Sequence, residues 1–156
     1  MEHEFFMNEA LKLARKSFDN KDVPVGAVIV KNNKIIGRGY NRKEFLKDAT
    51  EHAEIMAISD ACNKLESYHL EDCDLYVTFE PCPMCAGAII NARLRTVYIG
   101  AMNYRFGACG SYINLLNMEF NQKCNVITDI SGDECSSLIS EFFAILRKEK
   151  KNNLII

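Results

Sequence analysis

The 156-residue sequence has no apolar run near the roughly 18 residues that a membrane-spanning helix needs, so we expect no membrane segment. Its N-terminus lacks the basic stretch that opens a secretory signal, so we expect no export signal. No internal repeat, low-complexity segment or Pro/Gly/Ser linker divides the chain. With 48% hydrophobic and 26% charged residues, these absences predict one soluble, cytoplasmic domain spanning residues 1–156.

The sequence also lacks a strong net charge. The formal value of −2 excludes a uniformly basic nucleic-acid binder. The positive charge is nevertheless concentrated in residues 147–151, which read Arg-Lys-Glu-Lys-Lys. Such a segment either contacts phosphates or complements the dipole of a helix end, and the charge alone favours the second reading.

Seven cysteines are many for this length, but their odd number and the expected reducing compartment argue against a disulfide framework. Two of them form the motif Cys82-Pro83-Met84-Cys85. The others are scattered, and we expect them to be small buried hydrophobic residues: Cys62, Cys73, Cys109, Cys124 and Cys135.

Hydrophobic periodicity predicts four helices, over residues 4–19, 52–66, 83–92 and 133–149. Strands are predicted over residues 25–31, 34–40, 75–79 and 96–100, with 125–130 as a weaker fifth. Residues 101–123 should be irregular, with a helical turn near Leu115. Asn32-Asn33 should join the first two strands into an antiparallel hairpin. This order of elements implies an α/β fold in which helices cover a mixed sheet.

Two motifs carry chemistry: His52-Ala53-Glu54 and Pro81-Cys82-Pro83-Met84-Cys85. One imidazole and two thiolates are three of the four ligands that tetrahedral Zn²⁺ requires, and no fourth protein ligand stands at matching spacing. An open fourth position, occupied by water, is typical of a catalytic zinc.

The position of Glu54 constrains the geometry of the first motif. Residues two apart do not share a face of a helix, so His52 and Glu54 can converge only if the motif opens the helix. The stretch Asp48-Ala49-Thr50 supplies capping candidates for such a start. Burying Glu54 among apolar neighbours without a partner is costly, which favours a functional role.

Simpler interpretations of Cys82 and Cys85 are a redox pair or two core cysteines. They are much weaker, because the His52-Ala53-Glu54 motif would then stand about thirty residues upstream by coincidence. The combination resembles the H-x-E and P-C-x-x-C signature of zinc nucleobase deaminases.

The resemblance extends over nearly the whole chain. It is carried by VPVGAVIV (23–30), GYNR (39–42), HAEIMAI (52–58), LYVTFEPCPMCAGAII (75–90), IGA (99–101), GACGS (107–111) and ECSSLISEFF (134–143). These segments are similar to the bacterial tRNA-specific adenosine deaminases of the cytidine deaminase superfamily.

The resemblance implies a cytidine-deaminase-like three-layer α/β/α sandwich with a central mixed five-stranded sheet, assembled as a homodimer. It implies hydrolytic deamination of adenosine to inosine at the first anticodon position, with the tRNA anticodon stem-loop as partner and one Zn²⁺ per subunit. His52, Cys82 and Cys85 would bind the zinc. Glu54 would move protons from the water to the purine ring and the leaving ammonia.

The same resemblance assigns the substrate contacts. Asn41 would hydrogen-bond the flipped nucleoside, although its residue type alone suggests a turn. Val25 and Ala53 would belong to the base pocket. RNA contacts would come from Asn103, Arg105, Phe143 and Arg147. Core packing remains open for Phe143, because it follows the apolar face of the last predicted helix.

The sequence departs from the family at three positions. Asn103 replaces a carboxylate that contacts the nucleotide next to the target, Phe106 replaces a small residue, and Glu51 stands where alanine is usual. These changes affect RNA context and affinity rather than the chemistry. Two other functions stay open: a small-molecule deaminase acting on guanine, cytosine or a free nucleoside, and a zinc-stabilised binding module without catalysis.

Overall fold

The computed structural model describes residues 2–120 and 123–155. Its centre is a five-stranded sheet in the order β2-β1-β3-β4-β5. The strands are β1 Gly26–Lys31, β2 Lys34–Tyr40, β3 Asp74–Phe79, β4 Thr96–Ala101 and β5 Asn125–Ile127. β1 is antiparallel to β2 and to β3, while β3, β4 and β5 run parallel. The predicted hairpin and the mixed five-stranded sheet are therefore confirmed.

The helices are α1 Glu2–Asp19, α2 Lys43–Leu46, α3 Ala53–Leu65, α4 Pro83–Ala92, the 3₁₀ turn η1 Leu115–Asn117 and α5 Gly132–Ile155. All four predicted helices are present, and so is the turn near Leu115. Two boundaries differ from the prediction by more than two residues. β5 ends at Ile127, because Asp129 and Ser131 take left-handed backbone angles that turn the chain toward α5. α5 continues well beyond residue 149.

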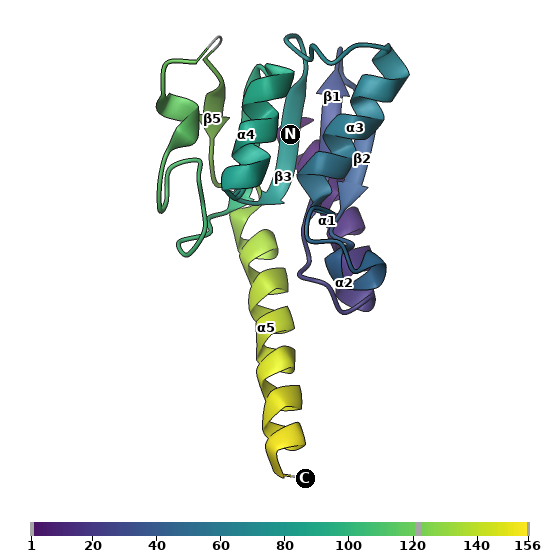
Figure 1. Ribbon diagram of the computed structural model, residues 1–156, viewed down its shortest axis with the longest axis vertical. Coiled ribbons are helices and arrows are strands. Elements are labelled where there is room, and N and C mark those ends of the chain that lie inside the picture. Colours follow the sequence, from purple (N-terminus) through teal and green to yellow (C-terminus); the bar gives the residue numbers. More distant parts are fainter. Residues whose placement is uncertain (1, 121–122, 156) are drawn as a thin grey trace.

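Helices cover both faces of the sheet, which makes the molecule a three-layer α/β/α sandwich as predicted (Figure 1). The two faces form separate hydrophobic cores. In β1, Ala27 and Ile29 join the core beneath α3 and α4, and Val28 and Val30 join the core beneath α1 and α5. This alternation follows from the two-residue period of a strand, and burial on both faces explains the nearly continuous apolar run.

The first turn of α3 lies close against β2. A Cβ atom at Gly39 would overlap the carbonyl oxygen of Ala53, and one at Gly37 would overlap that of Ala57. Ala53 and Ala57, both fully buried, keep the approach short on the helix side. These small residues fix the start of α3 against the sheet.

The expected burial of the scattered cysteines is largely confirmed. Cys73, Cys109, Cys124 and Cys135 are buried, Cys62 is half-buried, and all seven cysteines are free thiols. Among the described residues, no helix combines the length and the hydropathy that crossing a bilayer requires.

Candidate active site

The candidate site lies at the edge of the sheet where β3 and β4 end. β1 begins and β2 ends at the same edge, because Gly26 pairs with Tyr40 and Phe79 pairs with Ala101. α3 and α4 both begin there. α5 passes this edge and continues beyond the other elements (Figure 1). Segments distant in the sequence therefore meet in one place.

The structure brings His52, Cys82 and Cys85 together. The Nδ1 atom of His52 lies 3.6 Å from the Cys82 Sγ and 3.4 Å from the Cys85 Sγ. All three ligand atoms lie within 4.8 Å of one another, so one metal ion can contact all of them.

The starts of two helices supply these three residues. His52 is the N-cap of α3 and Cys82 is the N-cap of α4, both with extended backbone angles, and Cys85 lies in the first turn of α4. The positive end of a helix dipole favours a nearby thiolate.

Mutual hydrogen bonding polarises the three ligands. The pKa of the Cys82 thiol is lowered to about 4, chiefly by its hydrogen bond with the Cys85 thiol, and also by His52. The pKa of Cys85 is raised by the same bond and by burial. The pKa of His52 is raised by its hydrogen bond with Cys82. Cys82 is therefore a thiolate near neutral pH, which is the form of cysteine that binds a metal ion.

Glu54 is buried beside these ligands, at 3% exposure. Burial raises the pKa of its carboxyl to about 7, while the nearby His52 opposes the rise. A carboxyl group with this pKa can both accept and donate a proton near neutral pH. The expectation of a buried carboxylate at Glu54 is confirmed.

The start of α3 is capped differently from the sequence prediction. Asn41 Oδ1 accepts a hydrogen bond of 2.9 Å from the Ala53 backbone N–H, and Asn41 Nδ2 donates to the Val23 carbonyl at 3.0 Å. Asp48 instead accepts from the N–H and hydroxyl of Thr50. The capping role suggested for residues 48–50 was wrong, because the cap comes from a residue that only the fold brings near.

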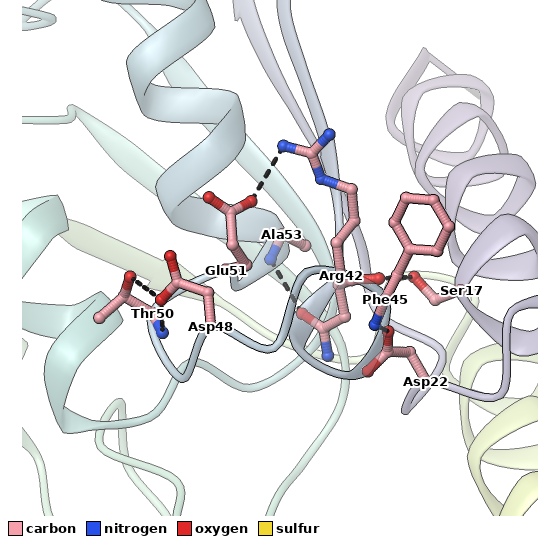
Figure 2. A network of polar contacts seen from close by, with 9 residues as sticks. Ser17, Asp22, Arg42, Phe45, Asp48, Thr50, Glu51 and Ala53 are labelled. Atoms are coloured by element: carbon pink, nitrogen blue, oxygen red, sulfur yellow. Dashed lines mark hydrogen bonds and ion pairs between the residues drawn. The ribbon is translucent and has the colours of Figure 1, made fainter.

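The loop between β2 and α3 is held by a polar network (Figure 2). Arg42 forms an ion pair of 2.9 Å with Glu51, and their backbones are also hydrogen-bonded. The buried carboxylate of Asp22 accepts from the N–H groups of Glu44 and Phe45, which secures α2. Glu51, one of the three departures from the family, therefore helps to hold the loop next to His52, a residue that could bind a metal ion.

An open cavity of about 1010 Å³ lies over this cluster. His52, Glu54 and Cys82 line it, as do the predicted contacts Val25, Asn41, Asn103, Arg105, Phe143 and Arg147. Ala53, which was expected in the base pocket, is fully buried and does not line the cavity, and its backbone N–H donates to Asn41 Oδ1. Phe143 lines the cavity, whereas its neighbour Phe142 packs in the core.

Several lining residues were not singled out from the sequence: Val23, Lys43, Phe79, Glu80, Met102, Tyr104, Ser136, Ile139 and Ser140. Glu80 could have been found, because a carboxylate that directly follows the buried strand β3 invites the same question as Glu54. Lys43 and Ser140 gave no local signal. They reach the cavity only through the placement of α2 and α5.

Comparison with known proteins agrees with this geometry. A family model described as MafB19-like deaminase matches residues 1–147. A tRNA-specific adenosine deaminase of Bacillus subtilis (strain 168) is 43% identical over 149 residues, covering 95% of this chain and 92% of the relative.

Two solved structures extend the comparison. One, from studies of A-to-I editing by tRNA deaminases at the wobble position, has a TM-score of 0.83 at 38% identity and covers 86% of this chain and 98% of its own. A guanine deaminase from Bacillus subtilis has a TM-score of 0.63 at 36% identity and covers 78% and 88%. The chain therefore belongs to the tRNA-specific adenosine deaminase family.

Proposed function

We propose that this protein deaminates adenosine to inosine at the first anticodon position of a tRNA, in the cytoplasm. The observation that carries this proposal is the convergence of His52, Cys82 and Cys85 with the buried Glu54 under an open cavity. The named relative and the wobble-position deaminase structure support the tRNA substrate.

We assign the metal as zinc, one per subunit. Tetrahedral coordination with Zn–S of about 2.3 Å and Zn–N of about 2.0 Å places sulfur and nitrogen about 3.5 Å apart. The observed separations of 3.6 and 3.4 Å from His52 Nδ1 fit that spacing. When bound, zinc supplies Lewis-acid activation of water near neutral pH.

The chain's own residues supply the proton transfers. The Glu54 carboxylate would accept one proton from the attacking water and deliver it to the purine ring. It would then take the second water proton from the new hydroxyl group and deliver it to the exocyclic amine, which leaves as ammonia. The overall reaction is adenosine plus water to inosine plus ammonia. Because the pKa of Glu54 is about 7, both directions of transfer are accessible near neutral pH.

The cavity wall would hold a flipped base. Val25 offers apolar contact. One N–H of the Asn41 amide donates to the Val23 carbonyl and the amide oxygen accepts from the Ala53 N–H, which leaves the second amide N–H for the nucleoside. An anticodon loop already exposes its bases, so extruding the target base costs little. Arg105, Arg147, Asn103 and Phe143 would contact the flanking RNA.

We also propose a homodimer. Large apolar side chains near α4 are exposed: Met84, Ile113, Met118 and Phe120. On α4 itself, a Cβ atom at Gly87 would meet no neighbour within 4 Å among the described residues. An uncovered apolar surface of this kind is typical of a subunit interface.

A second candidate function is deamination of a free base or nucleoside. The guanine deaminase structure favours it, since that protein is 36% identical to this chain. Its TM-score of 0.63 is lower than the 0.83 of the wobble-position deaminase, which places the small-molecule enzyme further away.

The decisive experiment is inosine formation by the purified protein on an anticodon stem-loop with adenosine at the first anticodon position, beside free adenosine, cytidine and guanine. Inosine in the RNA alone is expected. Turnover of a free base or nucleoside alone would reassign the protein to small-molecule metabolism.

The matched variant is Glu54→Gln, which keeps the size of the side chain but cannot exchange the proton. It should retain metal and fold and lose at least about 100-fold in kcat. Retention of most of the turnover would exclude Glu54 as the proton carrier, and absence of turnover in the metal-loaded wild type would favour a binding module.

A further inference from the structure

The segment after β4 forms one wall of the cavity. It is held by hydrogen bonds that the deamination chemistry does not require. Asn103 Oδ1 accepts from the backbone N–H groups of Arg105 and Phe106, and Asn103 O accepts from Gly107 N at 2.7 Å. Residues 103–107 are therefore a tight turn fastened by its own first residue. The side chains of residues 104–106 stand outside the ring of hydrogen bonds.

Glu80 fastens this turn to the end of β3. Its carboxylate is 2% exposed and accepts hydrogen bonds of 3.0 Å from the backbone N–H groups of Asn103, Cys109 and Ser111. The Ser111 hydroxyl donates a fourth bond. One buried side chain thus holds both ends of the segment 103–111.

The packing around Glu80 is close. A Cβ atom at Gly107 would overlap the Glu80 carboxyl group, so only glycine lets the backbone pass there. Leaving a charged group buried is costly unless its oxygens are hydrogen-bonded, and here they are. The arrangement holds the loop rigidly, so the side chains that the loop exposes have fixed positions.

The turn exposes two aromatic rings and one cationic side chain. Tyr104 is 80% and Phe106 63% exposed, Arg105 stands between them in sequence, and all three line the cavity mouth. Lys43 and Arg147 line the same cavity. Exposed aromatic side chains beside basic groups are the usual way in which proteins bind single-stranded nucleic acid, with bases stacked on the rings.

We propose that Tyr104 and Phe106 form a stacking platform for the nucleotides that flank the target adenosine, and that Glu80 is the positioning residue that holds it. The proposal rests on the RNA substrate proposed above. It adds two features to the deamination site: a surface on which RNA bases stack, and the Glu80 carboxylate that positions this surface. It also gives the exposed Phe106 a role, where the family has a small residue.

The first test removes the rings. In the variant with both Tyr104→Ala and Phe106→Ala, KM for the anticodon stem-loop should rise about tenfold for each ring removed, with kcat nearly unchanged. The matched control is Phe5→Ala, because Phe5 is a 55% exposed aromatic residue on α1 that does not line the cavity. An unchanged KM in the double variant overturns the platform.

Subunit contact is the other use for exposed rings, and sedimentation separates the two. The double variant should sediment as the wild type does. A shift to a smaller species, with the rise in KM explained by dissociation, overturns the platform in favour of an interface.

The second test concerns Glu80. Glu80→Gln replaces one acceptor oxygen by a donor that faces backbone N–H groups, so the turn should loosen and KM should rise. A positioning role predicts that Glu80→Gln adds little in the Tyr104→Ala, Phe106→Ala background, because both changes disable the same contact. An equal rise in both backgrounds overturns it. Ser111→Ala, which removes only the hydroxyl bond, is the milder variant that keeps the cycle measurable if Glu80→Gln unfolds.

Binding separates this proposal from the catalytic one. Anisotropy of a labelled stem-loop on Glu54→Gln protein reports the platform without turnover. If the wild type forms no inosine but removal of the rings still weakens binding, the platform is supported while the proposed function fails. Equal inosine formation by wild type and ring variant at limiting RNA would do the reverse.

Discussion

Two buried carboxylates line the same cavity and have opposite surroundings. Glu80 is enclosed by four hydrogen-bond donors, three of them backbone N–H groups. Glu54 is desolvated, and burial dominates its environment. A carboxylate whose oxygens are all engaged is suited to hold a loop, whereas one with a raised pKa is suited to exchange a proton.

The raised pKa of Glu54 has a consequence for stability. In the metal-free protein the folded-state pKa of about 7 lies above the ordinary value of 4.5. As the pH rises, the unfolded chain therefore loses this proton first, and the free energy of unfolding should fall between pH about 4.5 and 7. The decrease is at most about 3 kcal/mol. Glu54→Gln does not titrate, so its stability advantage over wild type should grow from pH 5 to pH 8.

Urea unfolding in the presence of a chelator measures this difference. Parallel stability profiles for the two proteins across pH 5–8 would mean that Glu54 is not held neutral by burial. The outcome also bears on function, because a residue that destabilises the folded protein is retained for its chemistry rather than for stability.

At the scale of elements, the sequence predicted the helices and strands that show a repeating pattern of apolar residues. The period of the apolar residues located the long helices and four of the strands, and Cys82 and His52 marked two helix starts by their chemistry. It could not predict α2, because Lys43–Leu46 is a single turn without a repeating pattern. It also misassigned the cap of α3, since Asn41 reaches Ala53 only after β2 has packed against the helix.

The candidate site likewise has one part that the sequence predicted and another that only the fold revealed. The clustering of His52, Cys82 and Cys85 and the burial of Glu54 were predictable, because coordination chemistry constrains residue type and spacing. Part of the cavity wall was not predictable, because Lys43 on α2 and Ser140 on α5 reach the cavity only through the fold. α5 is intermediate: its face at residues 136, 139, 140, 143 and 147 lines the cavity with helical spacing, but only the fold shows which face that is.

The end of α5 is expected to contact RNA phosphates. Arg147 lines the cavity, and the helix continues past the sheet edge with Lys148, Lys150 and Lys151 (Figure 1). Truncation after Leu146 should weaken stem-loop binding. It should also flatten the dependence of log affinity on log salt by about 0.7 for each phosphate that the shortened helix no longer neutralises.

Lys12→Gln is the matched control for this truncation, because Lys12 is an exposed α1 lysine paired with Glu9. It should leave the salt slope unchanged. If the truncated protein keeps the wild-type slope, the basic segment does not contact RNA and only complements the helix end.

At the scale of the whole molecule, the packing within a single subunit does not explain the large apolar side chains exposed in three regions. The cavity wall, the α4 face and the segment 112–120 all expose large apolar side chains. Each face of the sheet is already covered by helices, so these residues have no core of their own to join. A second copy of the chain would cover the α4 face and leave the cavity mouth open to RNA.

Gly87 on α4 provides the sharpest test of that assembly. A side chain there meets no neighbour within a subunit, and replacing a mid-helix glycine should stabilise an isolated subunit by about 0.5–1 kcal/mol. In a dimer that buries this face, Gly87→Glu should instead separate the subunits and reduce activity on RNA. Asn8→Glu, a similar change on the exposed face of α1, should do neither. Sedimentation at micromolar concentration distinguishes these cases, and a fully active wild-type monomer would exclude a site shared between subunits.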